Sequence, residues 1–226
     1  MNIKLGVIFG GVSVEHEVSI ISAVQAMQAL DKEKYDIIPI YITKDRQWYT
    51  GEILKDMETY TDMDLLKRYT SNVSLINKKG KFYLQSKGLF KHIVTELDLI
   101  LPVCHGTNME DGTLQGYLQT VGIPYCESDV ASSSVAQDKV TQKLVFQSKN
   151  LPMTAFTWFY DTDYSETPEE ILKECAKLKY PLIVKPATLG SSVGINFAKD
   201  ETELKSAIEE AVSYDKKILV EHAVEN

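Results

Sequence analysis

The order strand, helix, strand at the start of the chain constrains the fold more than any other feature. Residues 3–9 form a nearly continuous apolar run, which is typical of a strand covered on both faces of a sheet. After a turn at residues 10–13, residues 15–30 carry apolar side chains at helical spacing, with Ser13 as the expected N-cap. Residues 35–42 form a second apolar strand. Because such crossovers are right-handed and join parallel strands, the chain is predicted to begin with a Rossmann-like parallel α/β sheet.

The rest of the first domain is predicted to add to this sheet. Residues 44–92 are rich in Lys, Asp, Thr and Tyr, and two short apolar segments flank Asn77-Lys-Lys-Gly80. This pattern predicts a hairpin at the side of the sheet. A buried strand returns at residues 97–103, and residues 111–121 are predicted to form a helix. We place the end of this first α/β domain at residue 127.

A second domain of α+β type is predicted over residues 128–226. Residues 135–149 are expected to form a helix. The segment Thr167-Pro-Glu-Glu170 starts another, because it combines a threonine cap, a proline at the first position and acids in the first turn. Strands are expected at residues 153–160, 181–184 and 217–221, and a further helix at residues 200–213.

Composition narrows the class of protein. The 24 Lys and Arg against 32 Asp and Glu give a net charge of −8, which argues against a general surface for nucleic acid or anionic membranes. The three cysteines are scattered without metal-ligand spacing, so reduced thiols in a cytoplasmic protein are expected. No apolar stretch approaches the ~20 residues of a membrane-spanning helix. Met1 leads directly into a strand, so no signal peptide is expected.

An apolar strand delivers Lys185 to the start of a loop of small residues, 186–194. Gly190 and Gly194 are expected to allow turns that a β-carbon would resist, so that backbone amides can face an anion. The lysine precedes the loop, and no glycine-lysine-serine/threonine follows, so this is not a Walker motif. The pattern predicts a phosphate site, and a plain turn between two strands is the alternative.

Further polar side chains lie at predicted strand ends and helix starts, where open α/β sheets bind ligands. Glu15 begins the first helix, where a carboxylate either binds a ligand or complements the helix dipole. His105 follows a strand and is either a ligand contact or a hydrogen-bonded structural histidine, whereas His16 is expected to be packed or solvated. Lys139 and Glu221 are further candidates for ligand contacts. The alternative for Lys139 is a solvated helical face, and the alternative for Glu221 is a charge at the surface edge of the sheet.

Together these segments resemble the D-alanine–D-alanine ligase family of ATP-grasp enzymes over essentially the whole chain. Other ATP-grasp proteins share the glycine/serine loop loosely, whereas Gly10-Gly-Val-Ser-Val-Glu-His-Glu17 is much more specific to this family. The segments that carry the resemblance are residues 9–19, His105-Gly106 with Glu110-Asp111-Gly112 and Gln115-Gly116, Asp138-Lys139, residues 184–186 with 190–194, and Val220-Glu221.

The resemblance implies a fold and a reaction. The fold has an N-terminal α/β domain, here residues 1–127, and two lobes that clamp ATP, of which residues 128–226 are the first. ATP phosphorylates one D-alanine, and the amine of a second D-alanine attacks the acyl-phosphate to give D-alanyl-D-alanine for peptidoglycan synthesis. The magnesium ligands, an arginine and an ω-loop are expected beyond residue 226, so the 226-residue chain alone is expected to be inactive. A cytoplasmic homodimer without nucleic-acid or membrane partners is implied as well.

The site residues that the resemblance implies fall into two groups. Glu15 is expected to bind the ammonium group of the first D-alanine, a charge-assisted contact, and Ser191 is expected to hydrogen-bond towards it; these two are the expected catalytic residues. The first D-alanine is expected to contact Glu15, Val18 and His105. ATP is expected to contact Lys139, Lys185, Ser191, Ser192, Glu221 and Val224, with the two lysines on its phosphates.

Three positions depart from the family pattern. Met109 stands where a glycine is usual, Glu127-Ser128 replaces glycine-serine, and Gln137 replaces a common methionine. None of these removes a catalytic side chain, but Met109 predicts a different backbone in its loop. D-lactate or D-serine ligases of the same family are alternatives, as are a non-catalytic ATP-grasp nucleotide-binding module and a carboxylase-type ATP-grasp ligase. Residues 10–19 disfavour the last of these, because they form an amino-acid site.

Overall fold

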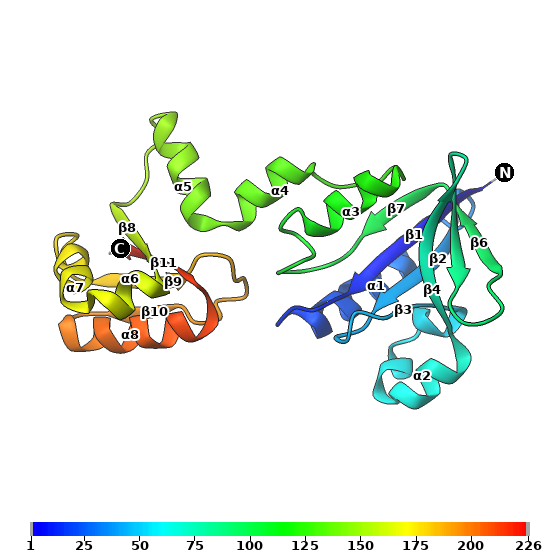
Figure 1. Ribbon diagram of the computed structural model, residues 1–226, viewed down its shortest axis with the longest axis horizontal. Helices are drawn as coiled ribbons and strands as arrows, with labels where there is room; N and C mark the ends of the chain where they lie inside the picture. The colour runs from blue at the N-terminus through cyan, green and yellow to red at the C-terminus, as the bar shows by residue number, and fades with distance from the viewer. Residues whose placement is uncertain (1, 225–226) are drawn as a thin grey trace. The chain divides into compact units, whose positions relative to one another are not determined.

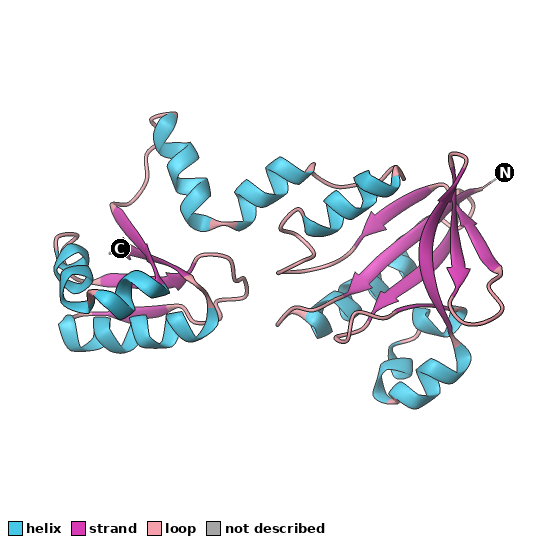
Figure 2. Ribbon diagram, in the orientation of Figure 1, coloured by secondary structure: helices cyan, strands magenta, loops and turns pink. Residues whose placement is uncertain are grey.

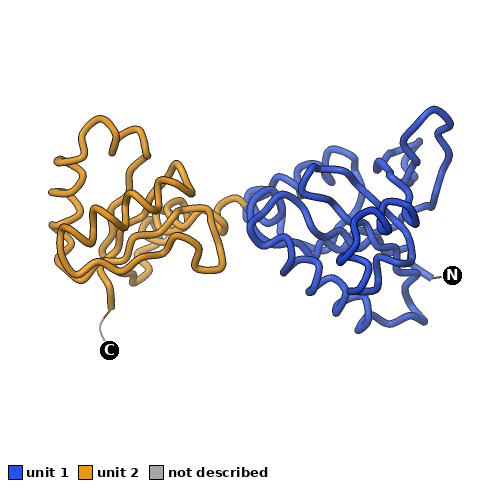
Figure 3. The backbone as a smooth tube through the Cα atoms, turned by 90° about the horizontal axis from the view of Figure 1, so that it is seen from below, with its two compact units in different colours: residues 1–133 blue, residues 134–226 orange. Residues whose placement is uncertain are grey.

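The computed structural model describes residues 2–224. The chain divides into two compact units, with the division between Ser133 and Ser134 (Figure 3). Helix α4 (Val130–Gln137) spans this division, and the domain boundary predicted after residue 127 lies just upstream of it. The boundary after residue 127, which separates two of the lobes expected for the family, stays a prediction. Each unit has its own sheet and its own hydrophobic clusters.

The first unit contains a seven-stranded sheet in the order β6-β5-β4-β3-β2-β1-β7 (Figures 1 and 2). Strand β1 (Ile3–Gly10) pairs in parallel with β2 (Tyr35–Ile42) on one side and with β7 (Leu99–Pro102) on the other. The predicted parallel α/β sheet is therefore confirmed for the centre of this unit. Since β1 and β7 are parallel, the loops that follow them leave from the same edge of the sheet.

The segment after β2 extends the sheet with antiparallel strands, as predicted for residues 44–92. The predicted hairpin is confirmed: β4 and β5 are joined by Lys79 and Gly80, whose φ angles of 55° and 82° suit a two-residue hairpin turn. The elements of this segment are β3 (Trp48–Thr50), η1 (Glu52–Lys55), η2 (Met57–Thr61), α2 (Met63–Tyr69), β4 (Ser71–Lys78), β5 (Lys81–Ser86) and β6 (Ile93–Leu97).

Helices cover both faces of the first sheet. Helix α1 (His16–Ala29) packs side chains such as Val24 against Val7, and helix α3 (Thr113–Val121) packs Leu118 against the opposite face. Successive residues of β1 enter different cores, because side chains alternate along a strand. Burial on both faces explains the nearly continuous apolar run of residues 3–9.

The second unit contains a four-stranded antiparallel sheet in the order β10-β9-β11-β8. The core on one face includes Leu172 and Ile208, from helices α7 and α8, with Val184 and Val220 of the sheet. The opposite face packs Leu219 against Val140 of α5. The elements are α5 (Lys139–Ser148), β8 (Phe156–Tyr160), α6 (Asp161–Glu166), α7 (Pro168–Ala176), β9 (Leu182–Pro186), β10 (Asn196–Ala198), α8 (Glu201–Tyr214) and β11 (Lys217–His222).

One helix prediction in this unit is wrong. A single helix was expected over residues 135–149, but the structure has α4 and α5 with a break at Asp138, whose ψ of 104° is extended. The Asp138 side chain accepts hydrogen bonds from the Val140 and Thr141 amides and so caps α5. None of the helices in residues 2–224 combines the length and apolar character that crossing a bilayer requires.

Candidate active site

Two loops at the carboxyl edge of the first sheet bring Glu15 and Gly106 together. Glu15 follows β1 and is the N-cap residue of α1, so the prediction of Ser13 as the cap is wrong. The Ser13 hydroxyl instead accepts a hydrogen bond from the Glu15 amide at 3.0 Å. A Cβ added at Gly106 would lie 2.6 Å from Glu15 Oε2 and would also collide with Ser13 Oγ. The carboxylate of Glu15 therefore lies directly against the loop after β7.

His105 is held by groups from two elements. Its Nε2 atom lies 3.1 Å from Ser22 Oγ on α1, and its Nδ1 atom lies 3.8 Å from Glu110 Oε1. The other oxygen of Glu110 accepts the Gly106 amide at 2.6 Å. These contacts fix His105 beside Gly106, and so near Glu15. Whether the imidazole contacts a substrate carboxylate stays a prediction.

His16 is packed in the interior. Packing was one of the two environments expected for it, and solvation was the other. The residue is 3% exposed, with Nδ1 lying 2.6 Å from the Gly11 carbonyl and Nε2 lying 2.9 Å from the Tyr41 hydroxyl. Since a carbonyl only accepts, Nδ1 donates to Gly11, and Nε2 shares the other hydrogen bond with the Tyr41 hydroxyl. Burial, with smaller contributions from Glu17 and Asp45, raises the pKa of Tyr41 to about 12, so its hydroxyl stays protonated. His16 therefore shapes the loop after β1 and is not placed to act as a base.

Met109 fills a specific space in the second loop. Its side chain is buried, and its sulfur packs so closely on Gly11 that a Cβ there would collide with it. Ser19 supports the same region, since its hydroxyl accepts the Gly10 amide and donates to the Val103 carbonyl, both at 2.8 Å. The two loops are thus joined by apolar contact and by hydrogen bonds. Met109, the predicted departure from the family pattern, thus serves as core packing between them.

In the second unit, Glu221 joins two lysines. Its Oε2 atom lies 2.5 Å from Lys185 Nζ, and its Oε1 atom lies 2.5 Å from Lys143 Nζ and 2.8 Å from Thr154 Oγ1. Strand β11 lies between β9 and β8, and Glu221 is 6% exposed, so the alternative of a surface edge charge is excluded. Burial acts to raise the pKa of Glu221, but hydrogen bonds from Lys143, Lys185 and Thr154 outweigh it and hold this pKa below its usual range.

Alternation along the strands explains why these side chains meet. Val184 and Val220 face α7 and α8, so Lys185 and Glu221, one residue further on, face the side where α5 packs. Helix α5 then places Lys143 over that face. A cavity of about 820 Å³ between α5 and β8 is lined in part by Thr154 and Phe156, which contact Glu221 and Lys143 respectively.

Lys139 lies at the start of α5 and contacts the beginning of the glycine/serine loop. Its ammonium group donates to the Ala187 carbonyl at 3.4 Å and to the Leu189 carbonyl, so the alternative of a solvated helical face does not hold. Thr188 anchors the same segment, since its amide and hydroxyl donate to Asp215 Oδ2 at 2.7 and 2.9 Å. The lysine is thus held at the base of the predicted phosphate loop.

The glycine/serine loop has a different backbone from the one expected. Left-handed φ angles occur at Ser191 (50°), Ser192 (59°) and Gly194 (67°), and not at Gly190. Non-glycine residues in this conformation carry strain, which is common in ligand-binding loops. The contact expected between Ser191 and Glu15 would join the two units, and it stays a prediction.

The remaining predicted site residues are exposed side chains. Val18 on α1 is 48% exposed and Val224, after β11, is 74% exposed. Sequence reasoning missed Ser22 and Thr154, which hold His105 and Glu221 in place. It considered Glu110 only as a metal ligand or a helix-start residue, whereas Glu110 accepts the Gly106 amide. Lys143, which pairs with Glu221, had a usable signal, since it follows Lys139 by one helical turn on the same face.

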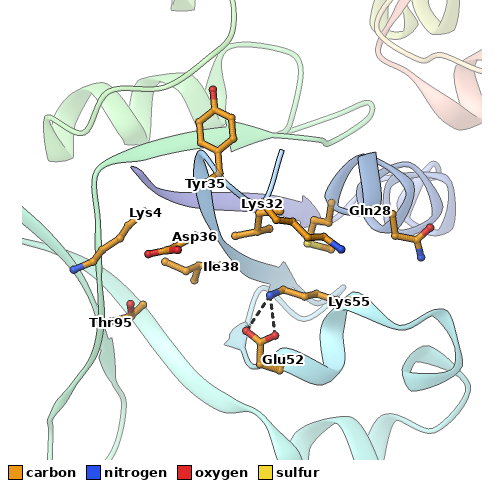
Figure 4. Close-up of a pocket in the computed structure, with 11 residues that line it drawn as sticks. Lys4, Gln28, Lys32, Tyr35, Asp36, Ile38, Glu52, Lys55 and Thr95 are labelled. Atoms are coloured by element: carbon orange, nitrogen blue, oxygen red, sulfur yellow. Dashed lines mark hydrogen bonds and ion pairs between the residues drawn. The ribbon is translucent and has the colours of Figure 1, made fainter. Parts of the chain in front are cut away.

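A separate cavity of about 570 Å³ opens at the other end of β1 and β2 (Figure 4). It contains none of the predicted site residues. Two of its lysines, Lys4 and Lys55, already pair with Glu96 and Glu52 at 2.9 and 2.7 Å. The cavity therefore lies apart from the candidate site of the first unit.

Comparison with known proteins decides the family. The family model for the D-ala D-ala ligase N-terminus matches residues 4–128, and the model for the D-ala D-ala ligase C-terminus matches residues 145–226. The chain belongs to the D-ala D-ala ligase family. A curated D-alanine–D-alanine ligase from Thermosipho melanesiensis is 40% identical over 220 residues, which are 97% of this chain and 59% of that relative. The chain thus spans about 60% of the length of the curated ligases that it matches.

Solved structures of the family share its fold. The D-alanine–D-alanine ligase of Coxiella burnetii superposes with a TM-score of 0.83 at 30% identity, covering 99% of this chain and 62% of that chain. VanG D-Ala:D-Ser ligase of Enterococcus faecalis gives 0.81 at 32% identity, covering 100% and 64%. The Bacillus anthracis ligase complexed with ATP gives 0.66 at 26% identity, covering 99% and 60%. These likenesses confirm the mixed α/β fold expected for the family.

Proposed function

We propose that this chain forms the first-substrate site and part of the ATP site of a ligase that joins two D-alanines at the expense of ATP. The observation that carries the proposal is the contact of Glu15 with Gly106 at the carboxyl edge of a parallel sheet. A carboxylate held there suits the ammonium group of an amino acid. Membership of the D-ala D-ala ligase family, and the names of the relatives, support the reaction.

In the proposed reaction, a carboxylate oxygen of the first D-alanine attacks the γ-phosphorus of ATP, and ADP leaves. The amine of the second D-alanine then attacks the acyl carbon, and loss of phosphate leaves the peptide bond. Glu15 holds the ammonium group of the first D-alanine, while Val18 and His105 line its site. The contribution proposed for the first unit is the positioning of this substrate.

The second unit supplies cations and amides for the nucleotide. Lys139 and Lys185 bind the phosphates and offset charge during transfer, and the amides of Ser191 and Ser192 cover them. Glu221 and the backbone near Val224 meet the adenine. Lys139 contacts loop carbonyls and Lys185 pairs with Glu221, so in this proposal the two lysines exchange these partners for phosphate oxygens of ATP.

Magnesium accompanies ATP in this proposal. Within residues 2–224, no group of three or more His, Cys, Asp or Glu side chains is arranged to hold a metal ion, so no step is assigned to it here. A cytoplasmic homodimer and a role in peptidoglycan synthesis and cell shape complete the proposal, and they rest on the family resemblance.

The test is Glu15→Gln in the protein expressed from its complete reading frame. Loss of a charge-assisted contact should raise the KM for the first D-alanine by about 10- to 100-fold while the KM for ATP changes little. The control is Glu17→Gln on the same helix, whose partner Lys44 is exposed, and it should leave both constants near those of the wild type. Equal changes in both constants for Glu15→Gln would refute the role of Glu15.

Acceptor specificity is measured in the same assay by phosphate release with D-alanine, D-serine and D-lactate. D-serine is included because VanG, named a D-Ala:D-Ser ligase, is 32% identical to this chain. We expect D-alanine to give the fastest release. Absence of phosphate release with all three acceptors would contradict the ligase and favour a nucleotide-binding module.

A further inference from the structure

The buried carboxylate of Glu221 pairs with two lysines, one more than charge neutrality requires. Lys143 and Lys185 each approach one of its oxygens at 2.5 Å, so the cluster of three side chains carries one excess positive charge. Glu221 is 6% exposed, and a buried carboxylate depends on a compensating charge. One lysine is sufficient to balance the charge of the carboxylate, which leaves the role of the second lysine to be explained.

The two lysines differ in their surroundings. Lys143 comes from the middle of α5, its side chain is 14% exposed, and its ammonium lies 3.3 Å from Thr154 Oγ1 and 5.1 Å from the centre of the Phe156 ring. The Lys185 side chain is 25% exposed and lies near the end of β9, just before the glycine/serine loop. Lys143 is therefore the more enclosed partner of Glu221, and Lys185 is the more exposed partner and the one next to the loop.

We propose that Lys143 is a positioning residue that remains on Glu221 and so allows Lys185 to move from Glu221 to a phosphate of the nucleotide. The inference rests on the proposed function, in which Lys185 binds ATP. If Lys143 were absent, departure of Lys185 would leave a buried carboxylate without a counter-charge. Glu221 would then either oppose the movement of Lys185 or take up a proton when ATP binds.

The groups around the Glu221 carboxylate support the assignment of this role to Lys143. Among the described residues that contact its carboxylate, α5 supplies Lys143 and β9 supplies Lys185. The segment leading into β8 supplies Thr154, which is uncharged, and Phe156 of β8 is paired with Glu221 in the sheet. Removal of Lys143 therefore leaves a neutral pair of Glu221 and Lys185, which should fold but should release Lys185 reluctantly.

The experiment measures ATP binding by calorimetry in the protein expressed from its complete reading frame. Lys143→Met should weaken ATP binding by about 10- to 100-fold at pH 7. Comparison of two buffers with different ionisation heats should show proton uptake on binding that exceeds the wild-type value, up to about one proton per ATP. Because Glu221 in the complex of this variant has a raised pKa, the deficit relative to the wild type should shrink as the pH is lowered from 7 to 6.

Two variants serve as controls. Lys143→Arg keeps the charge and should bind ATP nearly as the wild type does. Lys149→Met removes an exposed lysine from the end of α5 and should have no effect. If Lys143→Met does not fold, Lys143→Gln, which retains a hydrogen-bond donor without the charge, takes its place with the same expected result.

The outcomes separate this inference from the function on which it rests. Wild-type affinity in the Lys143→Met protein overturns it. Weaker binding that is independent of pH and takes up no additional proton also overturns it, because that would show a merely structural role. If the wild type does not bind ATP, or if Lys185→Met binds it as well as the wild type does, the proposed function fails instead.

Discussion

At the scale of single residues, the candidate site depends on a glycine, which has no side chain, as well as on polar side chains. Gly106 has a φ of 75°, and the space where its Cβ would lie is occupied by Glu15 Oε2 and Ser13 Oγ. Any larger residue would meet both backbone strain and these two side chains. The glycine therefore determines how closely the loop after β7 approaches the Glu15 carboxylate.

Gly106→Ala should test this approach. We expect it to lower the free energy of unfolding in urea by more than the roughly 1–3 kcal/mol of a left-handed alanine, and to raise the KM for the first D-alanine. Gly80→Ala is the matched control, because Gly80 has a φ of 82° but open space around its Cβ position. Equal losses of stability in the two variants would show that contact with Glu15 and Ser13 contributes nothing.

At the scale of elements, helix α5 carries much of the second unit's chemistry. It begins at Lys139, which contacts the glycine/serine loop, and one turn later it presents Lys143 to Glu221. Its start is set by Asp138, which caps the first amides and pairs with Lys217 Nζ at 2.5 Å. That ion pair joins α5 to strand β11 and so fixes the positions of Lys139 and Lys143 on this helix.

The substitution Asp138→Asn should remove the ion pair with Lys217 and keep the cap of α5. Burial acts to raise the pKa of Asp138, but Lys217 and the Thr141 amide hold it below its usual value. A carboxyl whose pKa is lower in the folded state stabilises the fold above its unfolded pKa and loses that effect as the pH falls. We expect a loss of about 1–3 kcal/mol at pH 7, from urea unfolding, that narrows below about pH 4.

The control for this prediction is Asp62→Asn at the start of α2. Asp62 caps its helix in the same way, by accepting from the Asp64 and Leu65 amides at 3.0 and 2.9 Å. Asparagine caps about as well as aspartate, so this variant should change stability by less than about 0.5 kcal/mol. A loss for Asp138→Asn that did not depend on pH would exclude the ion pair as its cause.

At the scale of the whole molecule, each unit has its own hydrophobic cores. The clusters on the two faces of the first sheet draw their members from residues 5–123, and those of the second sheet from residues 140–220. Separate cores of this kind are the usual mark of regions that can fold alone. The proposed sites for the amino acid and for the nucleotide thus lie on units with separate cores.

Expression of residues 1–133 and of residues 130–226 should therefore give two folded fragments. Each fragment should unfold cooperatively in urea, with a free energy of about 5–10 kcal/mol. The second fragment starts at 130 so that it keeps all of α4. Circular dichroism measures the transitions, and a fragment without a cooperative transition would show that its core needs the other unit.

The sequence by itself determined the central strands and the first helix, and it indicated the family. Apolar periodicity predicted β1, α1 and β2, and the hairpin signal at residues 77–80 predicted the turn between β4 and β5, because these patterns depend on neighbours along the chain. It also placed Lys185 at the end of its strand. Local periodicity failed at Asp138, where a cap interrupted a helical pattern that continued on both sides.

Only the tertiary structure decided which side chains meet. The pairing of Glu221 with Lys143 and Lys185 depends on the order of β9, β11 and β8 and on the packing of α5 over one face. The contact of Glu15 with Gly106 depends likewise on β1 and β7 being neighbours. A local pattern specifies the face on which a side chain lies, whereas its partners across that face are set by packing between distant segments.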